Sequence, residues 1–195
     1  MRVIILGSGK GTNAKSILET QEHSMLGNAK IVGIFSNVPS SGILDVAKHY
    51  SIQTEVIPCK KIFGKLEEKE ATLFTQKINE YSPDLIVLAG FMKILPETLL
   101  DAFPNKIINI HPSLLPSFKG LNAIERAFNF GVKISGCTVH FVDKEIDQGI
   151  IISQAPVRRM DSDTLEIFTQ KIQAAEHVIL PTTIANLSLA SDYEC

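Results

Sequence analysis

The sequence contains no tryptophan, few cysteines and no long uninterrupted apolar run. Its three cysteines, Cys59, Cys137 and Cys195, are odd in number, far apart and without CxxC spacing, which predicts reduced thiols. A membrane-spanning helix needs roughly 20 apolar residues, and charges or turn residues interrupt every candidate segment. The chain begins at Met1 and passes directly into apolar residues, without the pattern of a secretory signal. These absences predict a soluble, cytoplasmic protein.

An excess of positive charge is also missing, because the net charge is -2 and the isoelectric point is near 6.2. Such a chain has no basic field for a nucleic acid backbone, so any anion must be bound locally. We therefore expect small-molecule substrates as partners, and neither nucleic acid nor membrane. The sequence leaves the oligomeric state open.

The chain has 195 residues, of which 45% are hydrophobic, and this is enough for one sizeable core. Short apolar runs alternate with amphipathic stretches, which predicts an α/β fold: a single-domain, open, mostly parallel twisted sheet with helices on both faces. The domain is expected to span residues 1–189, followed by a short tail, residues 190–195. Strands are expected at 2–6, 30–36, 53–57, 84–88 and 106–110.

Helices are expected at 13–22, 42–50, 65–81, 124–130 and 164–187, with Asp163 as the candidate cap of the final helix. After Gly136 the pattern changes to alternating polar and apolar residues, then a polar turn, then the apolar run Ile150 to Ile152. This predicts an antiparallel hairpin near the C-terminus, before the final helix.

The first chemical signal is the glycine-rich segment from Gly7 to Asn13, between a predicted strand and a predicted helix. Glycines let the backbone approach an anion, and the free amides at a helix N-terminus favour a phosphate. A P-loop is excluded because Gly11, rather than Ser or Thr, follows Lys10, and the dinucleotide fingerprint fails at Thr12. The alternative is that these glycines only turn the chain, and the loop alone does not decide between the two.

A second signal is the segment NIHPSLLP, which begins at Asn109 at the end of the last predicted parallel strand. Ligands bind open α/β sheets at this edge. Because Pro112 disfavours helical backbone at the preceding residue, Asn109 and His111 should share one face of an extended segment. A core histidine and a turn asparagine are the alternative interpretations.

Two further polar residues lie in the predicted hairpin region. Asp147 lies in the turn between the two strands, where a carboxylate is usually only solvated. His140 has apolar neighbours along its strand, which is more typical of a structural histidine, so it is not a catalytic candidate. No two histidines have the spacing of a helical zinc motif, so no metal is expected.

Five motifs together carry a resemblance to a known family. They are GSGKGTN, LAGFMKILP, NIHPSLLP, GCTVHFVDKEIDQG and QAAEH, in this order between residues 7 and 177. The sequence resembles the glycinamide ribonucleotide (phosphoribosylglycinamide) formyltransferases from Val3 to about Leu187. The resemblance implies a Rossmann-like formyltransferase fold, an enzyme of purine biosynthesis, and 10-formyltetrahydrofolate as co-substrate.

The resemblance also implies roles for individual residues. Catalytic residues would be Asn109, His111 and Asp147. The phosphoribosylglycinamide substrate would contact Gly11, Thr12, Asn13, Gln173 and Glu176. The folate would contact, largely through backbone groups, Met92, Lys93, Ile94, Leu95, Asn109, Asp143, Lys144, Glu145, Ile146 and Asp147. A basic residue between Lys60 and Lys69 would meet the glutamate tail of the folate, although solvated lysines are the simpler alternative.

The expected chemistry fits these residue types. Attack of an amine on the formyl carbon places negative charge on oxygen, which a donor such as Asn109 would stabilise. His111, with an ordinary pKa of about 6.5, would move protons, and an ionised Asp147 would raise that pKa.

The sequence departs from the family pattern at three positions: Asn122 replaces a frequent histidine, Lys93 a frequent arginine, and Thr12 a frequent serine, whose hydroxyl it keeps. If the arginine makes bidentate contacts, Lys93 would lose them, which would weaken folate contacts more than catalysis.

Three other functions are alternatives to formyl transfer to phosphoribosylglycinamide. A methionyl-tRNA formyltransferase would be expected to have a further RNA-binding domain and a basic surface. A formyltetrahydrofolate hydrolase shares the catalytic trio and usually has an extra N-terminal domain. An inactive nucleotide-binding module would not need the trio.

Overall fold

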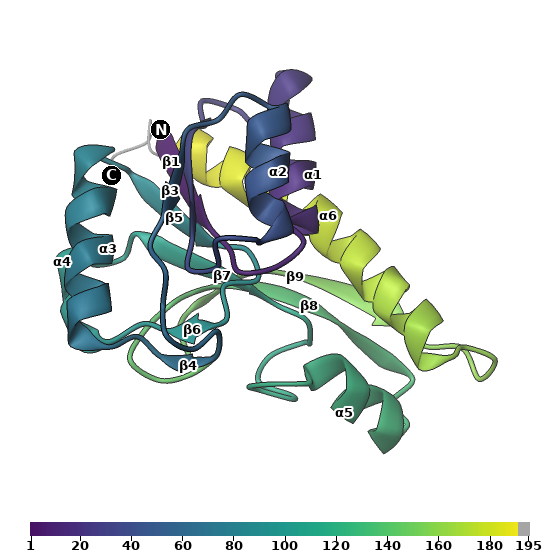
Figure 1. Ribbon diagram of the computed structural model, residues 1–195. Helices are drawn as coiled ribbons and strands as arrows, with labels where there is room; N and C mark the ends of the chain where they lie inside the picture. Colours follow the sequence, from purple (N-terminus) through teal and green to yellow (C-terminus); the bar gives the residue numbers. More distant parts are fainter. Residues whose placement is uncertain (191–195) are drawn as a thin grey trace.

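The structure, a computed structural model that describes residues 1–190, is built on a seven-stranded sheet with the strand order β3-β2-β1-β5-β7-β8-β9 (Figure 1). The first five strands in this order are parallel, whereas β8 is antiparallel to both β7 and β9. These strands are β1 (Arg2–Leu6), β2 (Lys30–Ser36), β3 (Thr54–Val56), β5 (Leu85–Leu88), β7 (Ile107–His111), β8 (Ile134–Phe141) and β9 (Ile151–Arg158). The predicted α/β fold with a C-terminal antiparallel hairpin is confirmed.

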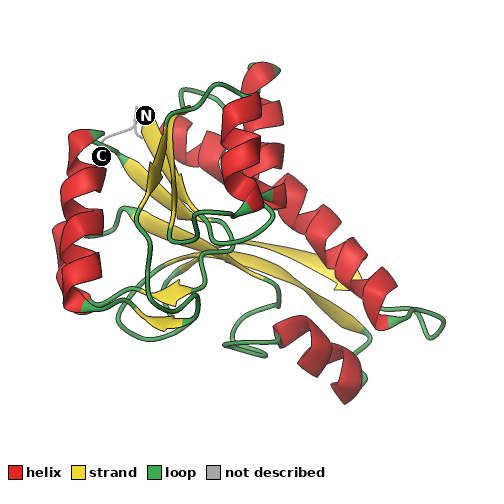
Figure 2. Cartoon of the chain, in the orientation of Figure 1, coloured by secondary structure: helices red, strands yellow, loops and turns green. Residues whose placement is uncertain are grey.

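Helices cover both faces of the sheet (Figure 2). They are α1 (Thr12–Glu22), α2 (Gly42–His49), α3 (Glu68–Glu80), α4 (Glu97–Ala102), α5 (Ala123–Phe130) and α6 (Leu165–Ala190). The buried side chains of α1, α2, α5 and α6 belong to one hydrophobic cluster, and those of α3 and α4 belong to a second. Two layers of helices therefore enclose the sheet, and the final helix is where the sequence predicts it.

The alternation of side chains along β1 explains this two-sided burial. Val3 and Ile5 belong to the first cluster, and Ile4 and Leu6 to the second. All four are fully buried, because successive residues of a strand face opposite sides of the sheet. A central parallel strand must therefore be apolar wherever it is buried, as β5 is at every position and β1 is from Val3 to Leu6.

The structure contains three elements that the sequence did not predict. β4 (Gly64–Lys65) and β6 (Lys93–Ile94) form a separate two-stranded parallel sheet, and α4 follows β6 directly. Because β4 uses the start of the segment predicted as a helix, α3 begins at Glu68 instead of residue 65.

The expected cap of the final helix is wrong. The hydroxyl of Thr164 accepts a hydrogen bond from the Ile167 amide at 3.2 Å, which is the geometry of an N-cap. Asp163 instead accepts from the Met160 amide at 2.8 Å and pairs with Lys171 at 2.7 Å. At its other end α6 includes Ala190, the first residue of the expected tail, and the remaining tail lies outside the described residues.

The composition led to expectations about membrane-spanning helices and about the cysteines. Among residues 1–190, no helix is both long and apolar enough to cross a membrane. Within the same range, Cys59 and Cys137 are free thiols, and burial raises the pKa of Cys137 to about 12.

Candidate active site

Asn109 and His111 lie at the end of β7, the last parallel strand before the antiparallel hairpin. As alternate residues of one strand, their side chains project from the same face of the sheet. On the neighbouring strand β8, His140 lies opposite Asn109 and Thr138 lies opposite His111. This pairing places four polar side chains where the sheet changes from parallel to antiparallel pairing.

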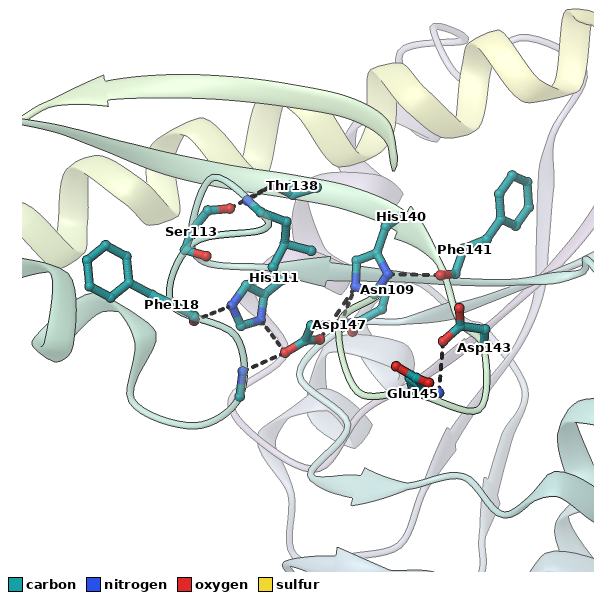
Figure 3. A network of polar contacts seen from close by, with 12 residues as sticks. Asn109, His111, Ser113, Phe118, Thr138, His140, Phe141, Asp143, Glu145 and Asp147 are labelled. Carbon is teal, nitrogen blue, oxygen red and sulfur yellow. Dashed lines mark hydrogen bonds and ion pairs between the residues drawn. The ribbon is translucent and has the colours of Figure 1, made fainter. Parts of the chain in front are cut away.

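Asp147 reaches this position from the turn between β8 and β9 (Figure 3). Its Oδ2 lies 3.2 Å from His111 Nδ1 and accepts a hydrogen bond from the Gly120 amide at 2.7 Å. The turn is closed by Gly149, where any side chain would collide with the Phe141 carbonyl oxygen. The structure therefore brings Asn109, His111 and Asp147 together from two distant parts of the chain.

The electrostatics of the pair differ from expectation. Burial alone would raise the pKa of Asp147, but contacts with His140, the Gly120 amide and His111 together lower it, so this carboxylate is ionised. Burial lowers the pKa of His111, and this outweighs the opposing effects of Asp147 and the Phe118 carbonyl. Asp147 does raise the pKa of His111 as expected, but burial of the imidazole, whose side chain is only 6% exposed, has the larger effect and leaves the pKa below its ordinary value.

His140 belongs to the same cluster, although its apolar neighbours along the strand predict a purely structural histidine. Its Nδ1 faces the Phe141 carbonyl oxygen at 2.9 Å, and its Nε2 lies 3.3 Å from Asn109 Nδ2 and 3.6 Å from Asp147 Oδ1. A carbonyl oxygen only accepts, so Nδ1 carries a hydrogen. Nε2 accepts from the Asn109 amide when the ring is neutral and donates towards Asp147 when the ring is protonated. The neutral ring therefore fixes which way the Asn109 side chain points. The alternation of Thr138 and His140 along β8 is visible in the sequence. It would have placed His140 beside Asn109 only if the register between β7 and β8 could also be predicted.

A hydrogen-bonded loop after β7 holds the other side of His111. The Thr138 hydroxyl donates to the Ser113 carbonyl at 2.7 Å and accepts from the Leu115 amide at 3.1 Å. This loop returns the Phe118 carbonyl oxygen to 3.0 Å from His111 Nε2. Both ring nitrogens of His111 thus face acceptors, and a neutral ring donates to only one of them.

The glycine-rich loop between β1 and α1 lies at the same edge of the sheet. Gly11 precedes α1 with a φ of 80°, and a Cβ there would lie 2.7 Å from the Ile43 Cα. Glycine is therefore required here by the left-handed backbone and by close packing against α2, which agrees with the alternative that the glycines turn the chain. The loop also leaves the first amides of α1 without acceptors inside the helix, as at any helix N-terminus. Both interpretations of the loop are compatible with its geometry.

Glu176 of α6 faces the start of α1. The Asn13 side-chain amide donates to Glu176 Oε2 at 3.1 Å, and the Asn13 Oδ1 is buried without a partner. Burial raises the pKa of Glu176 to about 7, against the opposing effect of Asn13. Gln173 is exposed one helical turn before Glu176, and Thr12 is exposed on α1. A shallow cavity of about 480 Å³ opens beside Thr12 and is also lined by Lys15 and His177.

The two segments expected to contact folate lie on either side of a surface ion pair. Lys144 in the turn after β8 pairs with Glu97 at the start of α4 at 3.1 Å, and Glu97 follows Leu95 by two residues. Met92, Ile94 and Ile146 are exposed apolar side chains. In the turn, the Glu145 amide donates to Asp143 Oδ1 at 2.9 Å.

The Lys93 side chain is not available for the folate contact that the comparison with a family arginine would suggest. Its side chain is 3% exposed and is directed towards Glu70, with 3.7 Å between Nζ and Oε2. A folate contact from this residue would therefore come from its backbone. Having lysine instead of arginine at this position would therefore not weaken folate binding through a lost side-chain contact.

Residues 1–184 match the family described as formyl transferase. The chain belongs to the formyl transferase family. It is 36% identical to the phosphoribosylglycinamide formyltransferase of Bacillus subtilis, covering 94% of this chain and 92% of that protein. It is 41% identical over 184 residues to the trifunctional purine biosynthetic protein adenosine-3 of Bos taurus, of which it spans only 18%.

Solved structures of family members have the same fold. Glycinamide ribonucleotide transformylase 1 from Symbiobacterium toebii superposes with a TM-score of 0.91 at 34% identity, covering 97% of this chain and 88% of that one. Phosphoribosylglycinamide formyltransferase from Anaplasma phagocytophilum superposes with a TM-score of 0.88 at 41% identity, covering 97% of this chain and 87% of that one.

Asn122 directly precedes α5 and lies in the left-handed region with a φ of 55°. Asparagine adopts this conformation more readily than most residues. No group of three or more histidine, cysteine, aspartate or glutamate side chains is arranged to hold a metal ion within the part of the chain that the structure describes.

Proposed function

We propose that this chain transfers the formyl group of 10-formyltetrahydrofolate to the amine of 5'-phosphoribosylglycinamide, by direct attack through a tetrahedral intermediate. The observation that carries the proposal is the 3.2 Å contact between His111 and Asp147 beside Asn109, in a chain that matches a phosphoribosylglycinamide formyltransferase over almost the full length of both. The domain that performs this reaction comprises residues 1–189, and the setting is cytoplasmic purine biosynthesis.

The sugar phosphate would bind at the N-terminus of α1. The amides of Thr12 and Asn13 are available to a phosphate, and the helix dipole favours its negative charge. The unpartnered Asn13 Oδ1 and the neighbouring Glu176 offer polar groups for the rest of the substrate. Gln173 and Gly11 complete this half of the site.

The folate would bind on the other side of Asn109, between residues 92–95 and the turn 143–147. Exposed Met92 and Ile94 supply apolar contact, and the backbone of the turn supplies hydrogen bonds for the polar edge of a pterin. The formyl group would then lie beside Asn109, between the two substrates.

Charge stabilisation would come from Asn109. One N–H of its amide points to His140, so the second remains for the oxygen of the intermediate. A donor fixed in this way stabilises negative charge in the transition state without reorganisation.

Proton transfer would depend on His111. Because burial lowers its pKa, the ring is mainly neutral at pH 7 and can accept a proton from the attacking nitrogen before passing one to the departing folate nitrogen. Asp147 stabilises the imidazolium that forms in between. Transfer through Nε2 requires the Phe118 carbonyl to move away, since it occupies that nitrogen in this structure.

The decisive experiment mixes the purified protein with 10-formyltetrahydrofolate in the presence and absence of phosphoribosylglycinamide and follows loss of the formyl group. We expect loss only when the amine is present, in equal amount with formylated product. Loss that is independent of the amine would establish the hydrolase activity instead.

A further inference from the structure

Lys93 and Glu70 form a buried ion pair outside the catalytic cluster. Their charged groups lie 3.7 Å apart, and their side chains are only 3% and 12% exposed. Removing two charges from water is costly, so a buried ion pair contributes little net stability compared with an apolar pair. The ion pair is therefore better explained by the segments that it connects than by its contribution to stability.

The Glu70 carboxylate connects α3 to the preceding loop. It accepts hydrogen bonds from the Glu67 amide at 3.0 Å and from the Lys60 amide at 3.3 Å. Burial alone would raise the pKa of Glu70, but these amides and Lys93 together lower it, so the carboxylate is ionised.

Lys93 connects the same loop to β6. Its ammonium donates to the Lys65 carbonyl at 3.5 Å, and the Leu66 amide donates to the Ile94 carbonyl at 3.0 Å. β4 and β6 pair in parallel at this point, below α3 in Figure 1. One ion pair thus joins α3, the loop before it and the segment after β5.

The segment that contains Lys93 is fixed from its other side by the glycine-rich loop. The Ser8 hydroxyl accepts from the Met92 amide at 2.9 Å, and the Ser8 amide donates to the Gly90 carbonyl at 3.0 Å. Because side chains alternate along an extended segment, the inward Lys93 leaves Met92 and Ile94 exposed on the opposite side. The exposed side is the one assigned above to folate.

We propose that Glu70 and Lys93 are positioning residues for the folate co-substrate: their buried ion pair holds residues 92–95 and the loop at residues 60–66 in the geometry that folate binding requires, without touching the folate. The inference rests on the proposed function. It assigns Lys93 a role beneath the folate site, and it assigns a role to Glu70 that the motifs did not suggest.

The test compares Lys93→Met and Glu70→Gln with the wild type in formyl transfer. Loss of ground-state positioning raises KM with kcat preserved, so we expect the folate KM to rise about tenfold while kcat and the KM for phosphoribosylglycinamide stay within about twofold. Since the two residues act as one unit, the double variant should be about as impaired as either single variant. Lys77→Met is the control, because Lys77 pairs with Glu80 at the far end of α3.

Lys93→Arg separates positioning from general damage to the fold, because it keeps the buried charge. We expect it to restore a folate KM near that of the wild type. An unchanged folate KM in Lys93→Met and Glu70→Gln, a loss confined to kcat, or Lys93→Arg as impaired as Lys93→Met would overturn the proposal. Wild-type protein without formyl transfer would contradict the proposed function itself, whereas active wild type with unaffected variants contradicts only the positioning role.

Discussion

Asn13 at the start of α1 donates its side-chain amide to Glu176, 163 residues later in α6, over 3.1 Å. The Glu176 side chain is buried, and burial raises its pKa from 4.5 to about 7. The folded protein therefore holds a proton on Glu176 between these values, whereas the unfolded chain releases it.

This difference predicts a pH-dependent cost in stability. Since the folded-state pKa is raised, the contribution of Glu176 to the unfolding free energy falls as the pH rises above 4.5, and the loss is complete above about 7. Glu176→Gln should remove up to about 3 kcal/mol of this pH dependence. Urea denaturation at pH 5 and pH 8 checks it, with the exposed Glu166→Gln on the same helix as control. A stability difference between wild type and Glu176→Gln that is equal at both pH values would contradict the prediction.

Replacement of His111 should separate catalysis from folding. General acid–base catalysis contributes about 100 to 10,000-fold, so His111→Ala should lower kcat by that order while the thermal midpoint changes little. Asp147 keeps its hydrogen bond from the Gly120 amide in this variant. Steady-state kinetics and a thermal melt provide the two measurements, and the exposed His49→Ala is the control. Unchanged turnover would exclude the assigned role of His111.

Asn109→Ala should affect the transition state more than binding. Loss of one oxyanion donor typically lowers kcat by about 100 to 1000-fold, and we expect a much smaller change in the folate KM. His140→Ala should produce a smaller loss in kcat, because Asn109 remains but is free to rotate. Equal losses in the two variants would show that His140 does more than orient Asn109.

The glycine-rich loop offers a matched pair of substitutions. A Cβ at Gly11 would lie 2.7 Å from the Ile43 Cα in a left-handed backbone, whereas a Cβ at Gly9 would meet nothing within 4 Å. Gly11→Ala should therefore destabilise the protein by at least about 1 kcal/mol, while Gly9→Ala should cost less than about 1 kcal/mol. Chemical denaturation of both variants measures this, and similar losses in the two would show that close packing against α2 is not the cause.

Much of the fold could be predicted because its determinants are local. Apolar runs such as Leu85 to Leu88 indicate buried strands directly, and Pro112 after His111 indicates extended backbone. β6 contains only Lys93 and Ile94 and depends on a partner 29 residues earlier, so no local pattern predicts it.

The site residues that lie at strand ends or within recognisable motifs, such as Asn109 and His111, could be predicted from the sequence. The prediction that Asp147 and His111 act together depended on the family resemblance, because spacing along the chain does not determine how a turn folds back. The role of His140 and the lowered pKa of His111 both depend on tertiary structure: the first on strand register, the second on the depth of burial. Sequence patterns do not contain either quantity.

The contact between Asn13 and Glu176 also has a consequence for biosynthesis of the protein. Synthesis produces the glycine-rich loop early, but the Asn13 side chain lacks its Glu176 partner until translation has reached α6. A chain that ended after Asp147 would therefore contain Asn109, His111 and Asp147 but would leave the Asn13 side-chain amide without Glu176 as its acceptor.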